Sequence, residues 1–229
     1  MYIAICNRLQ QKSENNSRTL WKTENRLCCN TPEMNSTDWR PLIKLLRGAG
    51  LEFEAGLTDP EIQGIESRFR FRFPPDLRSF LQTNVPFWNS PRWHTAIDSE
   101  IQSWLDEPMR GMLFDVEHSE FWLPEWGDRP EHLPDAFKIA SMKIGDAPKL
   151  IPILGHRYMP ALPKEAGNPV FSVHQTDIIY YGFDLEDYLR HEFNLPRQEW
   201  PAQVKKIEFW DPERFEQVYW DKNPSPTNL

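Results

Sequence analysis

The side chains that could do chemistry in this 229-residue chain are six histidines, three cysteines and 34 acidic residues. No histidine forms a His-Glu-x-x-His motif or another close pair of metal ligands. The nearest carboxylate neighbours are Glu117 and Glu120 beside His118 and Glu131 beside His132, and such adjacency is expected by chance in so acidic a chain. The sequence therefore predicts no metal site and no cofactor.

Nucleophile and phosphate-binding motifs are also absent from the sequence. All three cysteines precede residue 34, in a polar segment, so no Cys-His pair is expected in the body of the chain. There is no Gly-x-Ser-x-Gly elbow and no glycine-rich phosphate loop among only ten glycines. We therefore expect no enzyme. The alternative is an enzyme whose site lies in two aromatic loops, residues 86–94 and 121–127.

Charge divides the chain into a short basic segment and a long acidic one. Residues 1–33 carry five basic and three acidic side chains, which leaves a net charge of −10 after position 33. We expect residues 1–33 to be a polar, disordered extension. The chain has no run of about 18 apolar residues, as a membrane span requires. The first nine residues are too short for a signal peptide, so a cytoplasmic protein is expected.

One cluster of arginines raises the question of nucleic-acid binding. Arg68, Arg70 and Arg72 alternate with phenylalanines, and such alternation can stack bases between cations. An acidic body would, however, repel phosphate over most of its surface. We therefore expect the phenylalanines to pack inward, the arginines to face outward, and no nucleic acid to bind.

The elements around these side chains begin with a helical elbow over residues 56–83. Thr58 and Glu61 have the spacing of a capping box, and Pro60 fits the first turn of a helix. An apolar face follows at helical spacing until Pro74-Pro75 ends it, because a residue before proline avoids the α region. A second short helix is expected to begin at Pro75.

The remaining pattern changes from helical to strand periodicity. We expect helices over residues 38–48, 97–108 and 133–144, a short strand over 51–54, and an aromatic loop over 84–95. Strands are expected over 150–154, from 158 onward, and over 170–173 and 178–181, with a four-residue polar link, 174–177, in the last hairpin. Asp184 then caps a closing helix. The sequence predicts an α+β domain over residues 34–220, with N-terminal helices packed on an antiparallel sheet, and a frayed tail over 221–229.

The elbow resembles the N-terminal signature of the SUKH superfamily. The matching residues are Leu57, Thr58, Glu61, Ile62, Ile65, Glu66, Phe69, Phe73, Pro74, Asp76, Leu77, Arg78, Phe80 and Leu81. The resemblance covers roughly residues 51–193, and it departs where Asn84-Val85-Pro86 replaces the usual glycine-containing turn. It implies the same α+β order. It also implies relatives that are fungal cell-wall assembly regulators or bacterial immunity proteins that neutralise toxins.

Together these observations favour a protein-binding function. The resemblance implies a non-catalytic, immunity-type protein with a basic secreted toxin as partner; a regulatory scaffold is the alternative. An acidic domain suits a basic partner because opposite charge accelerates association, and aromatic side chains supply anchors. We expect the contact surface around the strand ends, formed by His156, Arg157, Tyr158, His174, Gln175, Asp177, Tyr180 and Tyr181.

Overall fold

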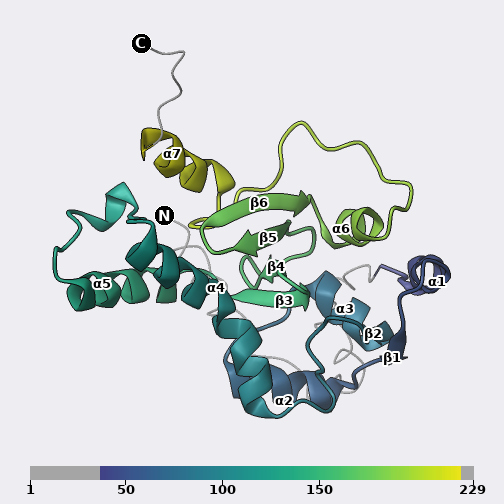
Figure 1. Ribbon diagram of the computed structural model, residues 1–229. Coiled ribbons are helices and arrows are strands. Elements are labelled where there is room, and N and C mark those ends of the chain that lie inside the picture. Colours follow the sequence, from purple (N-terminus) through teal and green to yellow (C-terminus); the bar gives the residue numbers. More distant parts are fainter. Residues whose placement is uncertain (1–36, 223–229) are drawn as a thin grey trace, which may run out of the picture. The chain divides into compact units, whose positions relative to one another are not determined.

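The computed structural model describes residues 37–222 (Figure 1). The extension expected over residues 1–33 lies outside the described residues, as does the expected tail except for its first two residues. The first half contains α1 (Arg40–Gly48), β1 (Phe53–Ala55), α2 (Asp59–Phe69), α3 (Pro75–Thr83), β2 (Asn84–Pro86), α4 (Asp98–His118), the 3₁₀ turn η2 (Pro124–Trp126) and α5 (Leu133–Gly145). The second half contains β3 (Leu150–Leu154), β4 (Arg157–Pro160), β5 (Val170–His174), β6 (Asp177–Gly182), α6 (Leu185–Glu192) and α7 (Pro212–Lys222).

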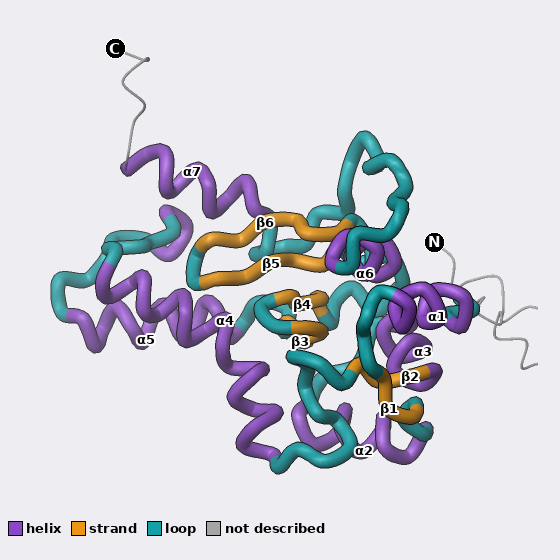
Figure 2. Tube along the Cα trace, turned by 45° about the vertical axis from the view of Figure 1, so that its right-hand side comes forward, coloured by secondary structure: helices purple, strands orange, loops and turns teal. Residues whose placement is uncertain are grey.

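The predicted α+β class is confirmed. The strands β3, β4, β5 and β6 form one antiparallel sheet in chain order, and α6 and α7 both contact β6. Alternating side chains of the strands enter two hydrophobic clusters, because successive residues of a strand point to opposite faces. One cluster joins the sheet to α1, α2, α3 and α6, and the other joins it to α4, α5 and α7. Figure 2 shows α6 and α4 on opposite sides of the strands.

The elbow forms as the sequence predicts. The hydroxyl of Thr58 accepts from the backbone N–H of Glu61, whose carboxylate accepts from the N–H of Thr58, and this completes the capping box. The helix α2 ends at Arg70 in the left-handed conformation, and α3 begins at Pro75. Both helices bury their predicted apolar faces in the first cluster. The arginines of the alternating segment face outward, and its three phenylalanines are buried.

The segment that follows the elbow differs from the prediction. Residues 84–95 were expected to be a loop throughout, but Asn84–Pro86 form β2, which pairs antiparallel with β1. The strand at β1 is displaced slightly from the predicted 51–54 to Phe53–Ala55. A close backbone approach lies next to this pair, since a Cβ at Gly56 would lie 1.8 Å from the carbonyl oxygen of Gln82. Only glycine fits there, so the end of α3 can return beside β1.

The expected end of the helix near Pro108 is wrong, because α4 continues for ten more residues to His118. Proline has no N–H, so the carbonyl of Trp104 loses its usual partner within the helix. The hydroxyl of Tyr158 on β4 lies 3.3 Å from that carbonyl oxygen and donates to it. A contact from the sheet therefore replaces the missing helical bond. Figure 2 shows that α4 bends along its length, as a proline inside a helix predicts.

The last hairpin is tighter than predicted. His174 pairs with Asp177, so the expected four-residue link is a two-residue turn of Gln175 and Thr176. Gln175 adopts a positive φ of 56°. The carboxylate of Asp115 on α4 accepts from the N–H of Thr176 at 3.0 Å and from its hydroxyl at 2.6 Å. The turn is thus anchored to α4, and its position is set by a helix distant in the sequence.

Candidate functional site

Of the eight predicted contact residues, the five that belong to the two turns or flank them gather at one end of the sheet: His156, Arg157, His174, Gln175 and Asp177. The antiparallel register pairs Arg157 with Ser172, so the β3–β4 turn and the β5–β6 turn lie at the same end. His156 and His174 are both exposed there, and their ring centroids are 6.3 Å apart. Burial lowers the pKa of His156, and the charges of Arg157 and His174 lower it further. Asp177 is exposed beside His174.

The three predicted tyrosines do not share a surface. Tyr158 is only 1% exposed, and its hydroxyl donates to the carbonyl oxygen of Trp104. Tyr158 therefore belongs to the core. Tyr180 packs against Phe171 in the second cluster, and burial together with the charge of Asp211 raises the pKa of Tyr180 to about 12. Tyr181 packs against the first cluster instead. Consecutive strand residues thus point to opposite faces, and both tyrosines are half-buried.

Arg157 is held by groups of its own chain. Its guanidinium lies 3.7 Å from the centroid of the Tyr181 ring, donates to the hydroxyl of Ser172 at 3.0 Å, and pairs with Glu192 at 3.4 Å. The ring of Tyr181 also stacks on His191, with 4.4 Å between the centroids. These contacts make Arg157 a structural link between β4 and α6, and they leave little of its charge for a partner.

Neighbouring residues that the sequence did not single out complete this surface. A groove of about 480 Å³ separates the β3–β4 turn from α4. It is lined by Glu100 and Glu107, and by Arg110, which pairs with Glu107. The loop after β2 reaches the same turn, because the N–H of Gly155 donates to the carbonyl of Asn89 at 2.6 Å. Trp88, next to Asn89, is 59% exposed. The sequence did not predict that the loop after β2 and α4 lie beside this turn, because the spacing of their residues does not indicate which end of the sheet they approach.

We call this surface the turn face. It combines exposed aromatic and apolar groups with carboxylates and two histidines, and its members are Trp88, Ile97, Glu100, Trp104, Glu107, His156, His174 and Asp177. Ile97 precedes α4 and is 63% exposed. Among the described residues, Glu100 and Asp177 form no ion pair. The turn face therefore offers free negative charge beside exposed apolar area.

The two aromatic loops proposed as an alternative enzyme site have different environments. In residues 121–127, the side chains of Phe121, Leu123 and Trp126 are buried in the second cluster. In residues 86–94, Trp93 is buried in the first cluster while the chain exposes Trp88. Residues 121–127 thus belong largely to the core, and residues 86–94 contribute Trp88 to the turn face.

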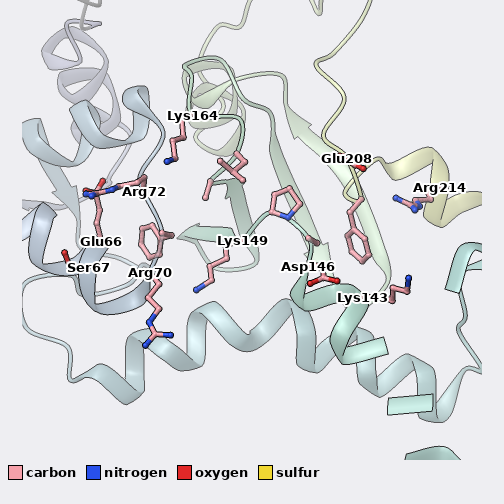
Figure 3. A pocket seen from close by; sticks show the side chains of 16 residues that line it. Glu66, Ser67, Arg70, Arg72, Lys143, Asp146, Lys149, Lys164, Glu208 and Arg214 are labelled. Atoms are coloured by element: carbon pink, nitrogen blue, oxygen red, sulfur yellow. The ribbon is translucent and has the colours of Figure 1, made fainter. Parts of the chain in front are cut away.

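A second charged surface lies at the other end of the β3–β4 hairpin. It is a cleft of about 830 Å³ between the exit of α2, the end of α5, the loop after β4 and the segment before α7 (Figure 3). Six cationic side chains and three carboxylates line it, which leaves an excess of three positive charges. We call it the basic cleft, and its cations are Arg70, Arg72, Lys143, Lys149, Lys164 and Arg214.

The cations of the basic cleft differ in how they are neutralised. Arg72 pairs with the buried carboxylate of Glu66, and Arg214 pairs with Glu125. The ammonium of Lys149 donates only to the backbone carbonyl of Phe69, at 2.8 Å. Within residues 37–222, none of Arg70, Lys143, Lys149 and Lys164 forms an ion pair. Four positive charges therefore line the cleft without a carboxylate partner, beside two carboxylates without an ion pair in the same part of the chain, Asp146 and Glu208.

Metal ligands, membrane spans and related proteins were each considered for the chain as described. No three histidine, cysteine or acidic side chains of the described part converge in an arrangement that could hold a metal ion. No described helix is long and apolar enough to cross a membrane. Comparison of the chain with protein-family models, with curated proteins and with solved structures gave no match. The SUKH resemblance consequently stays a prediction that rests on the residues of the elbow.

Proposed function

We propose that this chain is a non-catalytic protein-binding domain that contacts a basic partner through the turn face. The observation that carries the proposal is a groove lined by Glu100 and Glu107, with Trp88 and Ile97 exposed on the two chain segments that lead to it. Aromatic anchors with a polar surround are typical of binding hot spots. The carboxylates of Glu100 and Asp177, which have no ion partner among the described residues, would steer a basic protein toward this surface and make association sensitive to salt.

The elbow resemblance narrows the proposed partner. If the chain acts as SUKH immunity proteins do, the partner is a secreted toxin that the turn face covers, and a basic nuclease would match the charge. A regulatory scaffold role would use the same surface for another basic protein. Inhibition distinguishes the two, because an immunity protein abolishes the activity of its partner on binding.

The test begins with the full chain as bait in lysate of the native organism at moderate and high salt. Proteins captured at stoichiometric amounts are identified by mass spectrometry and produced separately, and their affinity is measured by titration calorimetry. We expect Trp88→Ala to weaken binding by about 30-fold, the effect of a hot-spot residue. Trp200→Ala is the matched control, because Trp200 is also exposed but is not part of the turn face.

Charge reversal supplies an independent test of the same surface. Glu100→Lys combined with Asp177→Lys should slow association and reduce its salt dependence, since both carboxylates are exposed and unpaired. Glu131→Lys, which reverses an exposed carboxylate ahead of α5, should leave association within about twofold of the wild type. If the double reversal and Glu131→Lys changed the association rate equally, or if Trp88→Ala bound the partner as tightly as the wild type, the turn face would be removed from the proposal.

A further inference from the structure

The basic cleft is not explained by a partner that binds the acidic turn face. The chain has a net charge of −8, yet once the pairs of Arg72 with Glu66 and of Arg214 with Glu125 are set aside, the four remaining cations of the cleft exceed its two remaining carboxylates by two. Four like charges around one cavity repel one another, and no carboxylate of the described residues pairs with them. Such a concentration of charge in a concave, partly enclosed site focuses the local potential and attracts anions.

The fold accounts for only part of this charge. Lys143 lies in the last turn of α5 and Arg70 caps the end of α2, where a cation stabilises the helix dipole. Lys149 and Lys164 come from loops and have no such role at a helix end. Figure 3 shows that these four residues approach the cleft from separate segments of the chain. Their convergence is a tertiary feature that helix stability does not require.

The walls of the cleft suit an organic anion. Leu162, which is 46% exposed, provides apolar surface beside the cations, and the largely buried rings of Phe71 and Phe209 add a little more. The volume of about 830 Å³ falls within the range of roughly 300–1,000 Å³ that is usual for small-molecule sites. A bare inorganic ion would leave most of this space empty. A molecule with both a flat apolar part and several negative charges would fill it.

We propose that the basic cleft binds a small molecule of the nucleoside polyphosphate class. Its phosphates would lie among Arg70, Lys143, Lys149 and Lys164, and its base would lie against the apolar wall. A nucleic acid fits less well, because its chain would extend beyond the cleft over a body with a net charge of −10. This proposal does not depend on the function assigned to the turn face.

The test is calorimetric titration of the full chain with ATP, without magnesium, and separately with pyrophosphate, a hexaglutamate peptide and a 20-nucleotide single-stranded RNA. We expect saturable binding of one ATP per chain and weaker binding of pyrophosphate, which lacks the base. No saturable ATP binding would overturn the proposal. Tighter binding of the peptide or of the RNA than of ATP would overturn it in favour of that ligand.

Variants locate the bound ATP. Lys143→Glu combined with Lys164→Glu should lower the affinity for ATP by about tenfold or more, because two attractive charges become repulsive. The control is Lys138→Glu, an exposed lysine on the same helix that does not line the cleft, and it should stay within about twofold of the wild type. The milder pair Lys143→Gln and Lys164→Gln keeps the test valid if the reversals impair folding. Equal losses in the control and cleft variants would reveal unspecific attraction and reject the proposal.

Discussion

The turn face and the basic cleft lie at opposite ends of the same β3–β4 hairpin, and they use charge in opposite ways. Next to the turn face, the guanidinium of Arg157 lies over the ring of Tyr181 and pairs with Glu192, so its charge serves the fold. In the basic cleft, Lys143 and Lys164 make no ion pair within the described residues. The type of a charged residue therefore does not indicate its role. Its role is indicated by the groups that neutralise its charge, and these groups come from distant parts of the chain.

The same contrast exists within the arginine-rich segment. Arg68 pairs with Asp98, thirty residues away, and Arg72 pairs with Glu66, whereas Arg70 between them faces the cleft without a carboxylate. The three arginines alternate regularly in the sequence, and each is exposed. Only the fold separates the two structural arginines from the one that is available to a ligand.

The largest effect is expected from the buried carboxylate at the edge of the cleft. Glu66 is 3% exposed and accepts from Arg72, Arg78 and the N–H of Phe73. Glu66→Ala should lower the free energy of unfolding by about 3–5 kcal/mol, since it leaves those donors without their acceptor. Chemical denaturation measures this. A loss below about 1 kcal/mol would show that water replaces the carboxylate and that the network is not structural.

A smaller effect is expected for the structural arginine at the turn face. Arg157→Ala should lower the free energy of unfolding by about 1–3 kcal/mol, because it removes the cation–π contact with Tyr181 and the ion pair with Glu192. Arg110→Ala, which removes an exposed arginine paired with Glu107 at the edge of the groove, should cost less than about 1 kcal/mol. Equal costs would contradict the assignment of Arg157 to the fold.

The cleft lysines should behave in the opposite manner. Replacing Lys143 and Lys164 together by glutamine should change the free energy of unfolding by no more than about 0.5 kcal/mol, because neither has an ion partner to lose. The same denaturation experiment measures this change, and a loss above about 1 kcal/mol would place these lysines with Arg157 as structural groups.

The smallest effect concerns the titration of His156. Burial, Arg157 and His174 lower the pKa of His156 below its usual 6.5, so His174→Gln should raise it. A lowered histidine pKa favours the neutral form in the folded state. The associated stability is therefore present above pH 6.5 and is lost as the pH falls toward the lower folded pKa.

Proton NMR of the His156 ring measures this pKa directly in both proteins. In His174→Gln the loss of stability on acidification below pH 6.5 should be smaller, and denaturation at several pH values checks it. An unchanged His156 pKa in the variant would mean that the two imidazoles do not interact, and that the histidines of the turn face act separately.

Much of the fold could be predicted because its signals are local. The capping box of Thr58 and Glu61, the break at Pro74-Pro75 and the alternation in β5 and β6 all depend on residues close in sequence. The length of α4 could not be predicted in this way. A proline normally ends or bends a helix, and the donor that satisfies the carbonyl of Trp104 comes from Tyr158, fifty-four residues later.

The candidate sites were predicted only in part. The strand ends and their histidines are visible in the sequence, because turns follow strands at regular intervals. The sequence does not indicate that Trp88, Glu100 and Glu107 approach these strand ends, or that Tyr158 is buried. The basic cleft was missed altogether, since its cations are spread from residue 70 to residue 214 and show no common spacing.

By itself, the sequence determined the helices of the elbow, the four strands, the α+β order and the acidic character of the body. These follow from periodicity, caps and composition, which neighbouring residues supply. Tertiary structure alone decided that α4 passes through Pro108, that the turn face combines a loop, a helix and two turns, and that four cations meet in one cleft. The physical reason is that hydrogen-bond satisfaction and charge neutralisation depend on partners in space, and the folded chain brings those partners from distant positions.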